Sequence, residues 1–108
     1  MQSKILMEIH RSMIKNFLDI MILAKLRNSG PLSGYDLIEL IYTKFGMLVS
    51  PGTIYSVLYS MERKELIKGA LTQGKRTYVL TAKGRDVINT ILTLQEEIQE
   101  FMRMILNF

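Results

Sequence analysis

The sequence predicts a mainly α-helical domain that carries one small β-hairpin, an α+β arrangement. Three stretches before residue 64 space their apolar residues as helices do. Two short segments rich in strand-forming residues follow, at 66–72 and 76–80, with a glycine between them. From Val87 onward, apolar residues recur in steps of three and four. At 108 residues, the chain has the length of one domain with its own core.

Composition and charge limit the classes of protein to consider. The chain is 48% apolar, contains no cysteine and has a net charge of +4. Absence of cysteine excludes disulfides and thiolate metal sites and fits the cytoplasm, where we expect the protein to be located. No apolar run approaches the ~20 residues of a membrane span, so we expect no membrane partner. Residues 1–76 carry 11 Lys and Arg against 6 Asp and Glu, whereas residues 77–108 carry 3 against 4.

The first predicted element is a single helix over residues 4–28, a stretch that contains neither proline nor glycine. Its second half, from Phe17 to Leu26, is apolar almost all round, so we expect it to be buried on most sides. The sequence NSGP at 28–31 then ends the helix.

Two short helices joined by a tight connection are predicted next. Ser33 and Asp36 form a capping box at the start of the first, with Asp in place of the usual Glu or Gln, and Gly46 ends it. Ser50 is an N-cap candidate, and Pro51 suits the first helical position, so a second helix begins here. Two helices this closely joined are typical of a helix-turn-helix.

The helix predicted over 50–64 has one apolar and one polar face. Ile54, Val57, Leu58 and Met61 gather on the apolar side, which we expect to face the core. The other face has hydroxyls, tyrosine and arginine but no carboxylate near the positive N-terminal end, which suits phosphates and base-edge acceptors. We interpret this segment as a recognition helix for double-stranded DNA. Its candidate DNA-binding residues are Ser50, Pro51, Gly52, Thr53, Tyr55, Ser56, Tyr59 and Arg63, of which Gly52, Ser56, Tyr59 and Arg63 project furthest outward.

The two predicted strands are separated by Gln73, Gly74 and Lys75, with the glycine where a tight turn needs positive φ. Three helices followed by a hairpin is the order of a winged helix. Lys75 and Arg76 then occupy the position from which a wing contacts a phosphate or the minor groove, and we add them to the DNA-binding candidates. A solvated hairpin tip without a binding role remains the alternative.

A last helix is predicted to begin after Thr81 and to run to the end of the sequence. A helix over 82–108 is longer than a winged helix can bury by itself, so we expect part of it to pack on a helix of a second chain. Folding back onto the first helix alone remains the alternative. The chain thus divides into a DNA-binding domain, 1–81, and a dimerisation helix, 82–108. The candidate dimerisation residues follow a heptad: Val87, Ile91, Leu94, Ile98, Phe101, Ile105 and Phe108.

Four segments carry a resemblance to a known family: LSGYDL at 32–37, VSPGTIY at 49–55, VLY at 57–59 and YVLTAKGR at 78–85. Together they resemble the PadR family of transcriptional regulators, in its subgroup with a single short C-terminal helix. The resemblance implies a homodimeric transcription factor whose helix from Ser50 enters the major groove, with Tyr55 as the aromatic often carried there. It also implies that Ser33 and Tyr35 lie near a phosphate and that Lys75 and Arg76 serve the wing.

This chain departs from the usual family pattern at three positions. Ser56 stands where the family usually has proline, Ser60 where it has arginine, and Glu65 where it has glycine. Loss of the arginine removes a phosphate contact, and Glu65 adds repulsion of phosphate at the helix end. We therefore expect the affinity or the preferred operator to differ from those usual in the family.

The features together predict a sequence-specific transcriptional regulator, a repressor, that binds an inverted-repeat operator as a homodimer with half-sites ~34 Å apart. One alternative is a sensor that holds a small hydrophobic effector at the dimer interface, as some members of the family do, although the chain has no tryptophan to stack on it. The other is a winged helix used only for protein contacts. We expect no enzyme, cofactor or metal site, because His10 stands alone and no carboxylate pair or phosphate-binding glycine loop is present.

Overall fold

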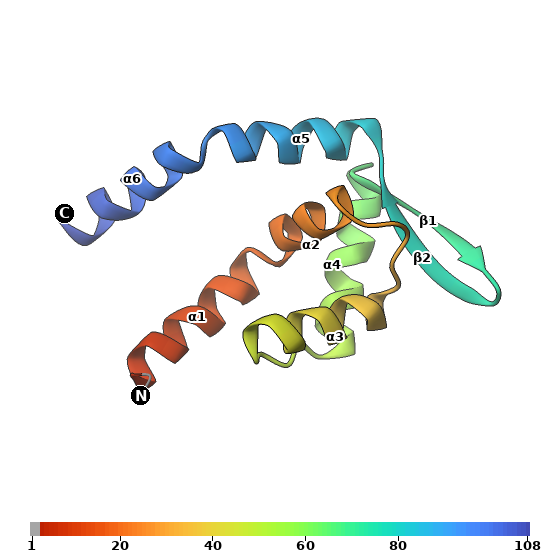
Figure 1. Ribbon diagram of the computed structural model, residues 1–108, viewed down its shortest axis with the longest axis horizontal. Coiled ribbons are helices and arrows are strands. Elements are labelled where there is room, and N and C mark those ends of the chain that lie inside the picture. The colour runs from red at the N-terminus through yellow and green to blue at the C-terminus, as the bar shows by residue number, and fades with distance from the viewer. Residues whose placement is uncertain (1–2) are drawn as a thin grey trace.

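The computed structural model describes residues 3–108, which form six helices and one antiparallel pair of strands (Figure 1). The predicted fold class, mainly α with a small hairpin, is confirmed. Helices α2 to α5 and the hairpin form a compact body, and α1 and α6 project from it as two arms on the side away from the hairpin tip (Figure 1). In chain order the elements are α1 (Lys4–Asn16), α2 (Leu18–Arg27), α3 (Gly34–Phe45), α4 (Pro51–Arg63), β1 (Ile67–Thr72), β2 (Lys75–Leu80), α5 (Ala82–Thr93) and α6 (Gln95–Leu106).

The core lies inside the body, around the inner face of α4. Helix α4 packs on α2, α3 and β1, and α2 also packs on α5 and β2. Ile54 and Leu58 of α4 are completely buried, and Ile22 of α2 and Ile88 of α5 are nearly so. The apolar face predicted for the second helix of the helix-turn-helix is therefore a core face, and its polar face is left outward.

Side-chain caps start the three helices that follow the first loop. Ser33 accepts the Asp36 N–H (3.0 Å) and Asp36 accepts the Ser33 N–H (2.9 Å), which is the capping box expected from the sequence. Ser50 accepts the Thr53 N–H at 3.2 Å, and Thr81 accepts the Gly84 N–H at 3.0 Å. These caps satisfy N–H groups that have no partner inside their own helices.

The hairpin has a two-residue turn rather than the predicted three-residue one. Gln73 and Gly74 both have positive φ, 54° and 74°, as the two central residues of a type I′ hairpin turn require. Lys75 pairs with Thr72 and is the first residue of β2, so its placement in the turn was wrong. Leu32 and Tyr78 exchange backbone hydrogen bonds, which tie the hairpin to the residues just before α3.

Residues 4–28 do not form the single helix expected from the sequence. The helix is interrupted at Phe17, whose φ of −114° and ψ of 21° lie outside the helical region. Just before the break, the Asn16 side chain donates to the Ser12 carbonyl at 2.8 Å, and just after it, Asp19 accepts the Ile20 N–H at 2.8 Å. Side-chain groups thus compete with the helical backbone for its hydrogen bonds, and the chain bends there.

The C-terminal segment is likewise two helices and not one. The break falls at Leu94, with φ of −104° and ψ of 14°. The Thr90 hydroxyl donates to the Asp86 carbonyl at 2.8 Å, and the Thr93 hydroxyl donates to the Thr90 carbonyl at 2.7 Å. Hydroxyls bonded back to carbonyls of the preceding turn bend helices. Helix α5 therefore packs on the body, while α6 leaves it at an angle (Figure 1).

Helix α4 ends in a Schellman motif built without a glycine. The Glu65 N–H donates to the Glu62 carbonyl (2.9 Å) and the Leu66 N–H to the Met61 carbonyl (3.0 Å). Glu65 has a φ of 61°, in the left-handed region that glycine prefers. The family's usual glycine at this position therefore has a direct conformational reason, and Glu65 holds the same backbone under strain.

Candidate nucleic-acid interface

The outer face of α4 is polar and open. Gly52, Ser56, Tyr59 and Arg63 are exposed, as the sequence predicted for the most outward positions. The Arg63 guanidinium lies 5.4 Å from the centre of the Tyr59 ring, a stacking that holds both side chains on the surface. Donors and a cation therefore line this face from its first turn to its last.

The N-terminal end of α4 is also open. Pro51, Gly52 and Thr53 are exposed, and no acidic residue lies in the first turn. The Ser50 hydroxyl accepts the Thr53 N–H and donates to the Thr53 hydroxyl at 2.9 Å, so it is already engaged by its own helix. The partial positive charge of this helix end is uncompensated and suits an anion such as a phosphate.

Tyr55 lies between α3 and α4 rather than on the open face. Its ring meets the Tyr35 ring edge-on, with centroids 5.9 Å apart. A Cβ added at Gly34 of α3 would lie only 2.5 Å from the Tyr55 ring. Burial raises the pKa of the Tyr55 hydroxyl. Tyr55 thus packs the two helices of the helix-turn-helix together, whereas Tyr35 is 62% exposed.

Ser33, expected near a phosphate, is buried, and its hydroxyl is occupied in the capping box. The hydrogen bond from the Ser33 N–H holds the pKa of the Asp36 carboxyl below its ordinary value, and Lys75 lowers it further. A carboxylate therefore lies at the start of α3, beside the exposed Tyr35.

The two basic residues at the start of β2, Lys75 and Arg76, point back to the helices. The Lys75 ammonium lies 3.3 Å from the Asp36 carboxylate, and the Arg76 guanidinium lies 2.8 Å from that of Glu62. Arg76 also lies over the Tyr78 ring, 5.7 Å from its centre, and the Glu62 charge raises the pKa of Arg76. Lys75 and Arg76 are therefore exposed but paired, and they hold the wing against α3 and α4.

Glu62 is the residue of this region that sequence reasoning missed. Its carboxylate accepts the Gly69 N–H at 3.2 Å as well as the bond from Arg76. It thereby joins the last turn of α4 to both strands. Arg76 is 14 residues away along the chain, so no local spacing could reveal the pair.

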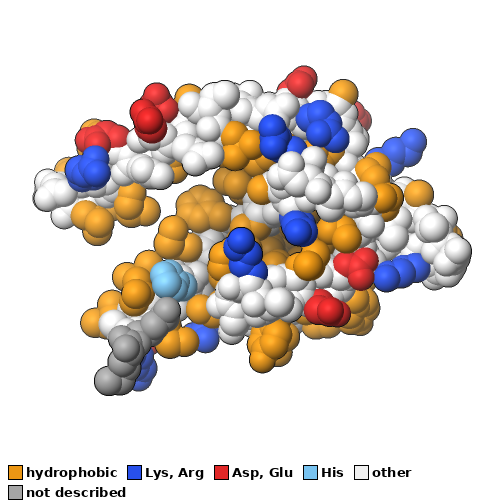
Figure 2. Space-filling view, viewed as in Figure 1, with side chains coloured by type: hydrophobic (Ala, Val, Ile, Leu, Met, Phe, Trp, Pro, Cys, Tyr) orange, Lys and Arg blue, Asp and Glu red, His pale blue; other side chains and the backbone are white. Residues whose placement is uncertain are grey.

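The predicted dimerisation residues divide between the body and the α6 arm. Val87 and Ile91 are half-buried against the core, whereas Ile98, Phe101 and Ile105 are 52% to 62% exposed. Leu94 at the bend and Phe108 beyond α6 are exposed as well. Every residue of α1 is also at least partly exposed, including apolar Ile5 and Ile9. Apolar side chains gather on the sides of the two arms that face each other across an open gap (Figure 2).

Two further observations concern residues 3–108. No helix among them is both long and apolar enough to cross a bilayer. Nowhere in the same range do three or more His, Asp or Glu side chains gather as potential metal ligands.

Helices α2, α3 and α4, followed by the hairpin, define the chain as a winged helix-turn-helix protein. Residues 22–90 match the Transcriptional regulator PadR-like family, and the chain belongs to that family. No curated protein matches the chain significantly.

Solved structures agree with this assignment. A PadR-like transcriptional regulator from Bacillus cereus matches with a TM-score of 0.74 at 24% identity. The match covers 90% of this chain and 98% of the Bacillus cereus chain. A PadR family regulator from Clostridium difficile has a TM-score of 0.70 at 25% identity, with coverage of 83% and 98%. Bacillus subtilis PadR in complex with operator DNA matches with a TM-score of 0.62 at 29% identity. The match covers 69% of this chain and 46% of the Bacillus subtilis chain.

Proposed function

We propose that this transcriptional regulator binds double-stranded DNA with α4 in the major groove. The observation that carries the proposal is the division of α4 into a buried apolar face and an outer face with Ser56, Tyr59 and Arg63. These side chains can donate to phosphates and to base edges, and the helix start carries no acid. Bacillus subtilis PadR, similar to this chain, has been solved with operator DNA.

The hairpin is proposed to contact the DNA backbone or the minor groove beside α4. Lys75 and Arg76 are already paired with Asp36 and Glu62, so a phosphate competes with a carboxylate for each cation. We expect these two residues to position the wing and to add less affinity than unpaired cations would. Arg63 is stacked on Tyr59 and has no carboxylate partner among the described residues, so it is free to meet a phosphate or a guanine.

The regulator is further proposed to act as a homodimer held by its arms. The apolar faces of α1 and α6 remain exposed in the single chain, which favours a partner that covers them. Their charges are complementary: α1 carries Lys4, Arg11 and Lys15 against Glu8, and α6 carries Glu96, Glu97 and Glu100 against Arg103. An α1 arm of one chain therefore suits an α6 arm of the other. In this arrangement α5 completes the body, and α6 is the part of 82–108 that reaches the partner.

A two-fold dimer presents two α4 helices, so its operator is proposed to be an inverted repeat with half-sites about one DNA turn, ~34 Å, apart. A dimer that covers such a site excludes other proteins from it, and we therefore propose repression as its effect.

Selection of bound fragments from the source genome, followed by fluorescence anisotropy on the selected duplex, tests this function. We expect affinity to fall steeply as salt rises, because bound cations release counterions from DNA. Arg63→Ala and Ser56→Glu should each weaken binding by about tenfold or more. Arg85→Ala, which removes an exposed arginine on α5, is the matched control and should change affinity little. Absence of salt-dependent binding to every duplex would remove the proposal.

A further inference from the structure

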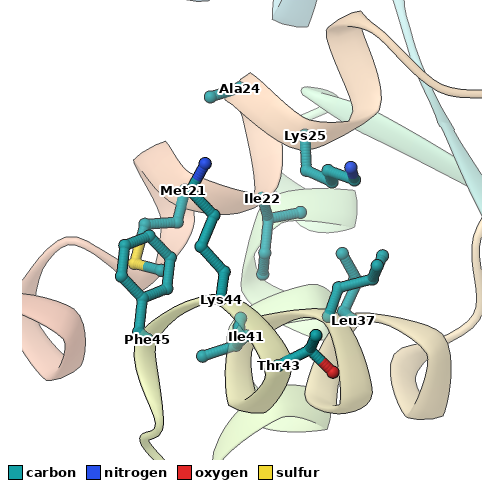
Figure 3. A pocket seen from close by; sticks show the side chains of 10 residues that line it. Met21, Ile22, Ala24, Lys25, Leu37, Ile41, Thr43, Lys44 and Phe45 are labelled. Atoms are coloured by element: carbon teal, nitrogen blue, oxygen red, sulfur yellow. The ribbon is translucent and has the colours of Figure 1, made fainter.

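A groove opens between α2 and α3, away from the outer face of α4 (Figure 3). The two helices that form its walls both pack on α4. Ile22, Leu37 and Ile41 form a buried floor, so the bottom of the groove is the surface of the core itself. Phe45 and Met21 close one end (Figure 3).

The size of the groove suits a small molecule. Its volume is about 380 Å³, within the range of small-ligand pockets. An α-helix with its side chains is ~10 Å wide and needs a long continuous channel. A single short cavity closed at one end by Phe45 offers no such channel.

The charges at the rim select the kind of molecule. The lining residues include Lys25 from α2 and Lys44 from α3 and no carboxylate. The Lys44 side chain reaches from α3 toward α2 beside Met21, and Lys25 stands on the α2 wall at the other end (Figure 3). Neither ammonium forms an ion pair with any described residue. Two unpaired cations above an apolar floor are complementary to an anion with an apolar body.

We propose that the groove between α2 and α3 binds a small amphiphilic carboxylate, with its apolar body on Ile22, Leu37 and Ile41 and its head group on one of the two rim lysines, Lys25 or Lys44. All the residues that line the groove belong to α2 and α3 and none to the arms α1 and α6. The site selects an anion, whereas a lysine-rimmed groove repels planar cations. Because α3 also carries Asp36, which holds the hairpin through Lys75, a ligand that joins α2 to α3 bears on the wing. Any effect of this ligand on DNA binding rests on the proposed function, but binding of the ligand to the groove does not.

Isothermal titration calorimetry of the full chain with decanoate, without DNA, tests the site. We expect saturable binding of one decanoate per chain, and binding of decyltrimethylammonium, a cation of equal chain length, at least about tenfold weaker. The double variant with Lys25→Glu and Lys44→Glu should weaken decanoate binding by about tenfold or more. Lys68→Glu, an exposed lysine on β1 outside the groove, is the matched control and should leave the affinity unchanged. Both lysines of the double variant are exposed, so the fold is expected to survive, and circular dichroism verifies this.

The proposal is overturned by an absence of saturable binding, by equal affinity for the cation, or by an unchanged affinity in the double variant. It is also overturned if the double variant changes the oligomeric state and leaves decanoate binding intact, because the groove would then be a contact with a second chain. Loss of decanoate binding in a variant that still binds DNA supports the site without depending on the DNA-binding role.

Discussion

The body and the arms of this protein use the same amphipathic pattern with opposite results. In the body, Ile54, Leu58 and Ile88 are buried by other elements of the same chain. In the arms, Ile98, Phe101 and Ile105 follow an equally regular spacing and remain half exposed. An apolar helical face therefore indicates that a partner is needed without indicating whether that partner lies in the same chain. The apolar faces of the body pack on one another, and those of the arms are proposed to pack on a second chain.

The largest expected effect falls on the body. Leu58→Ala removes a completely buried side chain beside Ile54 and should lower the free energy of unfolding by about 2–5 kcal/mol. Ser56→Ala, in the same helix but on its exposed face, should change it by no more than about 0.5 kcal/mol. Urea denaturation of the two variants measures the difference. Equal effects would contradict the assignment of the two faces of α4.

Gly84 tests how closely α5 is fitted to the body. A Cβ at this position would meet the Leu66 carbonyl oxygen at 1.9 Å, and backbone cannot move aside as a side chain can. We expect Gly84→Ala to destabilise the protein by about 1–3 kcal/mol. Gly52→Ala is the matched control, because a Cβ there meets nothing within 4 Å and alanine favours a helix. Thermal unfolding of both variants decides the point, and a tolerated Gly84→Ala would mean that α5 is not held so tightly.

Glu65 offers a gain in stability within the body. At a left-handed φ of 61°, a non-glycine residue is strained by about 1–2 kcal/mol relative to glycine. Glycine avoids this strain, but it offsets part of the gain because it makes the unfolded chain more flexible. Glu65→Gly should therefore raise the free energy of unfolding by about 0.5–1 kcal/mol. Glu65→Ala removes the same charge but keeps the strain, so urea denaturation should show no comparable gain. A gain of equal size in both variants would assign the effect to charge.

The smallest expected effect is a pH dependence at the start of α3. The pKa of Asp36 in the folded protein lies below its ordinary value of 3.8, so the unfolded chain takes up the proton first. The stability that the Asp36 carboxylate contributes is complete above the ordinary pKa of 3.8. It is lost as the pH falls through the lowered pKa of the folded protein. Asp36→Asn should flatten the pH dependence of urea denaturation in this acidic range, whereas Glu39→Gln, on the same helix, should retain it. An unchanged profile in Asp36→Asn would remove this role.

The sequence predicted the body better than the arms because the body is marked by local signals. Ser33, Ser50 and Thr81 cap helices where expected, and Gly74 lies in the turn, since hydroxyls and glycine act through neighbours only a few residues away. The breaks at Phe17 and Leu94 carry no such mark. Both residues are apolar and continue the helical pattern, and the bends arise where nearby polar side chains take up backbone hydrogen bonds.

The candidate site was predicted in part for the same reason. Helical spacing alone identified Gly52, Ser56, Tyr59 and Arg63 as exposed positions. It could not foresee that Arg76 pairs with Glu62 or that Lys75 pairs with Asp36, since both contacts depend on how the hairpin folds against the helices.

Sedimentation velocity tests the difference between body and arms most directly. Wild-type chain at micromolar concentrations should sediment as a dimer, and Ile98→Asp with Phe101→Asp, both on exposed positions of α6, should convert it to a folded monomer with unchanged circular dichroism. A wild-type chain that stays monomeric, or a double variant that stays dimeric, would contradict the proposal that the arms join two chains.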